Sequence, residues 1–154
     1  MLVIDTSTEK GFVALSETQV IFLSPEKKES IHLVATIKKL LNGKKPSCIA
    51  IGLGPGSFIG TRVGVLVGKM LAYAWDIPLK TFPSPAAFGD RVAIDAKSRG
   101  IYLYENGTTI LTKEPQINPL TSPHPHSLRV PCADVRETSP DLKKLFTSLA
   151  ETSP

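Results

Sequence analysis

Short apolar runs separated by polar turns occupy the first part of the chain. Residues 2–4, 12–15 and 20–23 are rich in β-branched and aromatic side chains, and Thr, Ser, Glu and Gln lie between them. Runs of this length and composition, bounded by polar residues, are typical of strands. The pattern predicts three strands, of which the last two form a hairpin.

Two longer segments change to the spacing of helices. Apolar side chains recur three and four positions apart in residues 30–41, and Asn42-Gly43 supplies a left-handed stop. A second helix, residues 60–75, is expected to end at Ile77-Pro78, because proline disfavours helical backbone at the residue before it. Two further strands are expected at residues 48–51 and 79–82. A brief helix is expected at residues 84–88, with Ser84 at its cap and proline at the first helical position.

The pattern of the first strands returns later in the chain. The stretches 3-VIDTSTEKGFVAL-15 and 93-AIDAKSRGIYLY-104 both give an apolar strand ending in Ile-Asp, a polar turn, a glycine and a second apolar strand. We therefore expect an α/β fold with a duplicated βββαβα unit. The first domain would be complete over residues 1–90. The second, residues 91–154, is shortened and rich in Pro, Ser and Thr after residue 114, with a helix only at 141–150.

Composition and charge narrow the class of protein. The chain has 154 residues, of which 42% are hydrophobic, and no apolar run approaches the ~18 residues of a membrane span. The N-terminus lacks the basic segment of a signal peptide, and the two cysteines form no disulfide framework. These features favour a cytoplasmic protein. The net charge of +4 is spread over lysine pairs, which favours a basic solvated surface over a polyanion groove.

A glycine-dense loop, 52-GLGPGSFIGTRVGVLVG-68, follows the fourth predicted strand. It matches neither the Walker motif nor the dinucleotide fingerprint G-x-G-x-x-G. Its position between a strand and a helix still provides free amides that favour an anion. Candidate residues for an anion or nucleotide contact are Gly54, Gly56 and Ser57, together with Asp5 and Thr6 at the end of the first strand.

The second helix carries a stripe of small residues. Gly60, Gly64, Gly68 and Ala72 recur at intervals of four, and each glycine inside a helix costs about 1 kcal/mol relative to alanine. A stripe of this kind lets another backbone approach closely. Since most of the remaining circumference is apolar, we expect a second cover besides the helix's own sheet, either the first helix or another protein. A narrow polar arc is left to Arg62, Lys69 and Tyr73.

Taken together, these residues resemble the TsaB (YeaZ) family. The family pattern G-P-G-S-[FY]-T-G-x-R-[IV]-G, then a small-rich helix and I-P-L, is similar to residues 54–64 and 77–79. The opening 4-IDTS-7 is similar to the family's I-D-T-[AS]. Residues 94–102 are similar to its I-D-A-R-x-x-E-[VI]-Y. The resemblance covers about residues 1–105.

The resemblance implies a fold and a function. The fold is that of the actin/Hsp70/sugar-kinase superfamily, which is ribonuclease H-like. The function is that of a non-catalytic partner of TsaD in making threonylcarbamoyladenosine (t6A) at position 37 of tRNA. The family docks on TsaD through the helices of its first domain and can form a homodimer through the same surface. TsaE, an ATPase, joins the complex, and tRNA is contacted only indirectly. ATP or ADP and magnesium would bind only at the partner complex.

The resemblance places the partner interface on the two helices of the first domain. This sequence departs from the family pattern at Ile59, where a threonine is usual, at Ser30, where many members have histidine, and at Gly100, where glutamate is usual. The expected interface residues are Ile31, Val34, Ile37, Gly60, Arg62, Gly64, Leu66, Gly68, Lys69 and Tyr73.

Residues for catalysis are sparse. The H-x-x-x-H metal motif of the TsaD relatives is missing, since His32 stands alone and His124-Pro125-His126 lies in a proline-rich stretch. Neither Cys48 nor Cys132 has an identifiable base, so no catalytic or metal-binding residue is assigned. A rival hypothesis is a small ATPase or phosphotransferase of the same superfamily, in which Asp5 and Asp95 hold magnesium and phosphate. The alternative role for each aspartate is to cap the following turn.

Overall fold

The computed structural model describes residues 1–24, 30–95, 100–105, 107–112, 133–134 and 139–152. A five-stranded sheet has the order β3-β2-β1-β4-β5. The strand β1 pairs antiparallel with β2 and parallel with β4, with Ile4 opposite Val13 and Ile51. The strands of this sheet are β1 (Leu2–Asp5), β2 (Phe12–Ala14), β3 (Val20–Phe22), β4 (Ile49–Gly52) and β5 (Leu79–Phe82).

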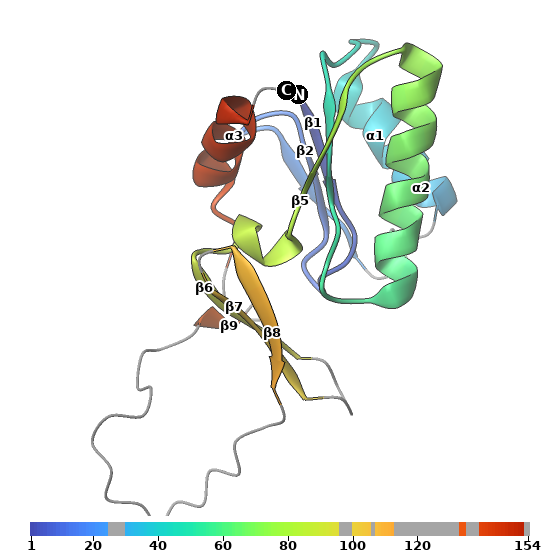
Figure 1. Cartoon of the computed structure of the whole chain (residues 1–154). Helices are drawn as coiled ribbons and strands as arrows, with labels where there is room; N and C mark the ends of the chain where they lie inside the picture. Colours follow the sequence, from blue (N-terminus) through green and yellow to red (C-terminus); the bar gives the residue numbers. More distant parts are fainter. Residues whose placement is uncertain (25–29, 96–99, 106, 113–132, 135–138, 153–154) are drawn as a thin grey trace, which may run out of the picture.

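Two helices cover one face of this sheet (Figure 1). They are α1 (Ser30–Leu41) and α2 (Phe58–Trp75), and they provide the crossovers that the parallel strands require. Alternate residues of β1 and β4, such as Leu2 and Ile51, pack in one apolar cluster with Leu33 and Ile37 of α1 and Val67 of α2. The periodicity predicted from the sequence therefore gives one helix layer on this face.

The opposite face of the sheet is also covered (Figure 1). The 3-10 helix η2 (Ser84–Ala87) and the helix α3 (Leu142–Glu151) lie there. Leu145 and Leu149 of α3 join a second apolar cluster with Val3 and Phe12 of the sheet. The predicted C-terminal helix is thus confirmed, and it packs against strands from the beginning of the chain.

A second sheet repeats the strand order of the first. Its order is β8-β7-β6-β9, with two antiparallel pairs followed by one parallel pair, as in β3-β2-β1-β4. This arrangement agrees with the duplication inferred from the two Ile-Asp segments. The predicted boundary between residues 90 and 91 stays a prediction. The strands are β6 (Arg91–Asp95), β7 (Ile101–Glu105), β8 (Thr108–Thr112) and β9 (Ala133–Asp134).

Local capping explains where the helices begin. The side chain of Ser57 accepts a hydrogen bond from the Gly60 amide, so α2 begins at Phe58, two residues before the predicted start. Asp141 caps α3 in the same way by accepting from the Lys144 amide. Pro83 precedes η2, although Ser84 was predicted to be its cap. The residues His124, His126 and Cys132 lie outside the described residues.

Candidate functional site

The turn after β1 is a buried polar network. Asp5 Oδ1 accepts hydrogen bonds from the Ser7 amide at 2.8 Å and from the Ser7 hydroxyl at 2.7 Å. The Ser7 and Ser84 hydroxyl oxygens are 2.6 Å apart, and Ser84 Oγ accepts from the Gly54 amide at 2.8 Å. A hydroxyl has one proton, so while Ser7 donates to Asp5 the Ser84 hydroxyl supplies the proton between the two serines. Asp5, Ser7 and Ser84 are buried.

The glycine loop is fastened to this network. The Ser57 amide donates to the Ser7 carbonyl at 2.6 Å, and the Ser84 amide donates to the Gly54 carbonyl at 2.9 Å. Thr6 Oγ1 donates to the Gly60 carbonyl at 2.6 Å. Several of the amides that made this strand-to-helix turn a candidate anion site are therefore bound by the chain itself.

The five predicted loop residues do lie together, but their arrangement favours a structural role. Asp5 and Thr6 are buried beneath the loop formed by Gly54, Gly56 and Ser57. A Cβ atom added at Gly56 would lie 2.2 Å from the Ser7 carbonyl oxygen, so glycine is needed here for close approach. The contacts agree with the alternative in which Asp5 caps its own turn. The side chain of Asp95 lies outside the described residues.

The glycine stripe of α2 faces the helix's own sheet. A Cβ atom at Gly60 would lie 2.1 Å from the Thr6 carbonyl oxygen, and one at Gly64 would lie 2.4 Å from Thr6 Oγ1. At Gly68 it would lie 2.3 Å from Ile51 Cδ1. The stripe is therefore filled by the helix's own sheet and not by the first helix or another protein, so the second cover expected for α2 would have to lie on another side of the helix. The glycines let α2 lie directly on β1 and β4.

This geometry removes four residues from the predicted partner interface. Gly60, Gly64 and Gly68 are buried on the side of α2 that faces the sheet. Ile37 of α1 is 2% exposed, because it points into the cluster between α1 and the sheet. A partner cannot touch these side chains without displacing a helix. The interface itself stays a prediction, and it needs other residues.

The opposite side of α2 is exposed and largely apolar. Ile59, Leu66, Met70 and Tyr73 are 74%, 57%, 62% and 91% exposed, although aliphatic and aromatic side chains are usually buried. Arg62 lies among them, with its guanidinium 3.8 Å from the centre of the Phe58 ring. The spacing 59, 62, 66, 70 and 73 puts these residues along one helix face. We call this surface, together with exposed Phe58, the α2 outer face.

The first helix also exposes apolar side chains. Ile31 is 73% exposed, Val34 is 44% exposed, and α1 lies beside α2 on the same face of the sheet (Figure 1). Of the ten predicted interface residues, six are exposed: Ile31, Val34, Arg62, Leu66, Lys69 and Tyr73.

Comparisons with known proteins agree with the sequence pattern. The family model described as "TsaD: tRNA N6-adenosine threonylcarbamoyltransferase" matches residues 26–109, more than half of the chain. The protein named tRNA threonylcarbamoyladenosine biosynthesis protein TsaB from Bacillus subtilis (strain 168) is 33% identical, over 70% of this chain and 56% of its own length. The chain belongs to the TsaB (YeaZ) family.

Other TsaB relatives extend the comparison. The protein of the same name from Buchnera aphidicola subsp. Schizaphis graminum is 27% identical, over 74% of this chain and 65% of its own length. This chain thus spans less than two thirds of either curated relative. The structure of YeaZ from Pseudomonas aeruginosa superposes with a TM-score of 0.63 at 22% identity, over 97% of this chain and 90% of that one. The fold is therefore the actin-like, ribonuclease H-like α/β fold with a shortened second unit.

Several residues of this TsaB-family site were missed in the sequence. Ser84 was assigned only as a helix cap, and nothing in its local pattern links it to Ser7, 77 positions away. Phe58, Ile59 and Met70 were not assigned to the interface. Their helical spacing with Leu66 and Tyr73 was a usable signal, because it puts these residues together on the side of α2 away from the glycine stripe.

Proposed function

We propose that this chain is a non-catalytic scaffold subunit that binds a TsaD-like threonylcarbamoyltransferase during t6A modification of tRNA. Curated relatives carry the name of a t6A biosynthesis protein, which supports the pathway. The observation that carries the proposal is the exposed α2 outer face. It acts as a docking surface, and the buried Asp5 network acts as its support.

The α2 outer face has the composition of a protein interface. Aromatic residues, methionine and arginine are enriched at the centres of such interfaces, and Tyr73, Met70 and Arg62 supply all three kinds. Large apolar side chains in contact with water are favourable to bury, at about 25 cal/mol per Å² of apolar surface. Contiguous exposed apolar surface on a soluble protein marks an interaction site.

The buried turn supports a scaffold over the rival ATPase. Asp5 would have to reach magnesium and phosphate, but it is 0% exposed and its Oδ1 atom already accepts two hydrogen bonds from Ser7. Freeing this carboxylate would break the contacts that attach the Gly54 loop to β1. In this proposal a TsaE-like ATPase, ATP and magnesium enter only with the partner complex, and tRNA is contacted indirectly.

The test is binding to the TsaD protein of the same organism, measured by isothermal titration calorimetry. The variant Leu66→Ala/Tyr73→Ala should weaken binding at least about tenfold, because central apolar anchors carry most of the binding energy. Ile110→Ala is the matched control, since Ile110 is 61% exposed but lies on β8. Both variants should keep the circular dichroism spectrum of the parent.

Two outcomes would contradict the proposal. One is no measurable binding between the parent chain and the TsaD protein. The other is a folded double variant that binds as tightly as the parent. ATP hydrolysis by the chain alone that is lost in Asp5→Asn would favour the rival enzyme.

A further inference from the structure

The strand β8 forms an open edge of the second sheet. In the order β8-β7-β6-β9 it pairs with β7 on one side, and among the described residues no strand pairs with its other side. The strand has five residues, Thr108–Thr112, and the first four are exposed. Ile110 and Leu111, on opposite faces of the sheet, are 61% and 48% exposed. The open edge therefore coincides with large apolar side chains in contact with water.

This edge lacks the features that commonly keep an edge strand from pairing. Proteins shorten such strands, or place lysine, proline or other protective residues on them. In the first sheet, β3 has only three residues and β5 carries Lys80. In β8 none of the five residues is charged, and four of the five are threonine or isoleucine, which favour strands. The neighbouring acid, Glu105 of β7, is already paired with Arg91 at 3.0 Å.

The register of the hairpin determines which backbone groups face the open edge. Glu105 lies opposite Thr108 with two residues between them, and the residues that flank such a turn bond to each other. Hydrogen-bonded and non-hydrogen-bonded pairs alternate along an antiparallel ladder. Thr108 and Ile110 therefore direct their backbone groups toward β7, whereas Thr109 and Leu111 direct theirs toward the open edge.

We propose that the open edge of β8 pairs antiparallel with β8 of a second copy of this chain, about a two-fold axis at Ile110. A two-fold dimer needs a self-complementary surface, and this edge is one. Thr109 of each copy lies opposite Leu111 of the other, and these are the residues whose backbone groups face outward. Ile110 lies opposite Ile110 of the second copy in a non-hydrogen-bonded pair, in which side chains approach most closely.

The pairing also buries a row of apolar side chains. Leu103 of β7 lies opposite Ile110 and is 37% exposed. Across the two-fold axis, this row continues through Ile110 and Leu103 of the second copy, and covering such apolar surface is favourable. Two four-stranded sheets then join into one of eight strands. Because each copy has one β8, the arrangement closes at two copies.

A second copy fits this edge better than a strand of a charged partner. The described residues of β8 carry no charge that would select such a partner, whereas a second copy presents a strand of the same length and register. The helices α1 and α2 lie on the first sheet, away from β8 (Figure 1). The dimer therefore leaves the α2 outer face free, and the pairing does not depend on the proposed function.

A cysteine at the axis tests the geometry directly. In a chain with Cys48 and Cys132 replaced by serine, Ile110→Cys should form a disulfide-linked dimer in a glutathione redox buffer, because opposite Cα atoms of a non-hydrogen-bonded pair are about 4.5 Å apart. Thr108→Cys is the matched control, since its two copies would lie four residues apart along the strand, about 13 Å. Non-reducing gels should show at least about tenfold more dimer for Ile110→Cys. Equal linking of the two variants would overturn the inference.

Self-association without a covalent bond gives the second readout. Because β8 is short, the dimer buries less surface than a standard interface, and we expect a dissociation constant of about 0.1 mM. Ile110→Lys puts two ammonium groups opposite each other and should weaken association at least about tenfold in sedimentation equilibrium. Thr81→Lys, at an exposed position on the edge strand β5, is the matched control and should associate as the parent does. All chains carry Leu66→Ala/Tyr73→Ala, which removes association through the α2 outer face.

The outcomes separate this inference from the proposed function. If the parent stays monomeric, or if its dimer is unaffected by Ile110→Lys in a chain that keeps the parental circular dichroism spectrum, the pairing is wrong. Assemblies that grow beyond two copies would also contradict the two-fold arrangement. In the chain with an intact α2 outer face, Ile110→Lys should bind the TsaD protein as the parent does. If it loses this binding instead, β8 docks on that protein and the inference is overturned. If the parent itself does not bind the TsaD protein, the scaffold role fails and the dimer stands.

Discussion

The two sheets share a strand order but differ in how their faces are covered. In the first sheet, β1 and β2 are buried at every residue, with α1 and α2 on one face and α3 and η2 on the other. In the second sheet, burial is only partial, and β8 is exposed at every residue but its last. Val92 and Tyr104 are buried, whereas Leu103 and Ile110 on the other face are 37% and 61% exposed.

This difference shows that strand order alone does not determine packing. The same antiparallel pairs and parallel addition form both sheets, yet among the described residues only the first sheet has helices packed on two faces. Apolar area removed from water provides most of the stabilisation in a layered fold. Substitutions in the first sheet should therefore cost more free energy of unfolding than similar substitutions in the second.

The largest difference should come from the glycines. Gly60→Leu should lower the free energy of unfolding by about 4 kcal/mol or more, because even a Cβ atom there would lie 2.1 Å from the Thr6 carbonyl oxygen. Gly107, between β7 and β8, has no atom within 4 Å of an added Cβ. Its positive φ of 90° sets the expected cost of Gly107→Ala at about 1 kcal/mol. Urea denaturation measures both, and equal losses would contradict the comparison.

The same glycines show what the sequence could establish. The interval of four predicted a close approach along α2, and the structure confirms a close approach. The sequence could not say which surface approaches, because glycine stripes pack equally well on a sheet, a helix or another chain. That choice depends on β4 and on β1, and Thr6, which follows β1, lies 54 positions before Gly60 in the sequence.

A pair of isoleucines gives the next largest contrast. Ile4 of β1 is 0% exposed and packs in the cluster beneath α1 and α2, so Ile4→Ala should cost about 3 kcal/mol through lost burial and the cavity that remains. Ile110→Ala removes the same atoms from a side chain that is 61% exposed, and we expect less than about 1 kcal/mol. Thermal unfolding followed by circular dichroism measures both changes. A loss for Ile110→Ala as large as for Ile4→Ala would mean that the outer face of the second sheet is covered.

The strands of the second sheet were predicted less completely than those of the first. The Ile-Asp repeat located β6 and β7, but β8 was missed although Asn-Gly at residues 106–107 is a strong hairpin signal.

The buried network at Asp5 was only half predicted. The cap on its own turn is a local interaction, whereas its link to Ser84 joins segments that only the folded sheet brings together.

Removing a polar contact to α3 should lower the free energy of unfolding by less than the substitutions of buried glycine and isoleucine do. Lys80 of β5 donates hydrogen bonds to the Leu149 and Thr152 carbonyl oxygens, both at 2.7 Å, at the C-terminal end of α3. A cation at this end also interacts favourably with the helix dipole. Lys80→Met keeps most of the aliphatic chain and should cost about 1 kcal/mol, measured by urea denaturation. Lys69→Met, on the exposed face of α2, is the control and should leave stability unchanged within about 0.5 kcal/mol.

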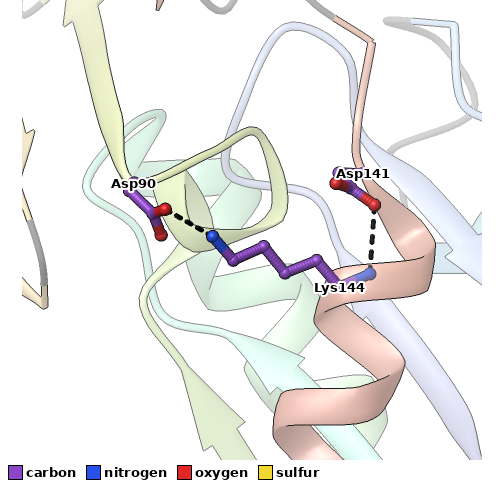
Figure 2. Close-up of polar contacts among 3 residues, drawn as sticks. All are labelled: Asp90, Asp141 and Lys144. Atoms are coloured by element: carbon purple, nitrogen blue, oxygen red, sulfur yellow. Dashed lines mark hydrogen bonds and ion pairs between the residues drawn. The ribbon is translucent and has the colours of Figure 1, made fainter.

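Removing the ion pair between the residue before the second sheet and α3 should have the smallest effect on the free energy of unfolding. Asp90, which precedes β6, pairs with Lys144 of α3, and Asp141 caps the same turn of the helix (Figure 2). The side chains of Lys144 and Asp90 are 51% and 62% exposed, so solvent and salt screen their attraction. Asp90→Asn should therefore cost less than about 0.5 kcal/mol, and the loss should disappear at about 1 M NaCl. Asp141→Ala, which removes the cap, should cost about 1 kcal/mol at either salt concentration. A larger loss for Asp90→Asn than for Lys80→Met in urea denaturation would mean that α3 is held mainly by the second sheet.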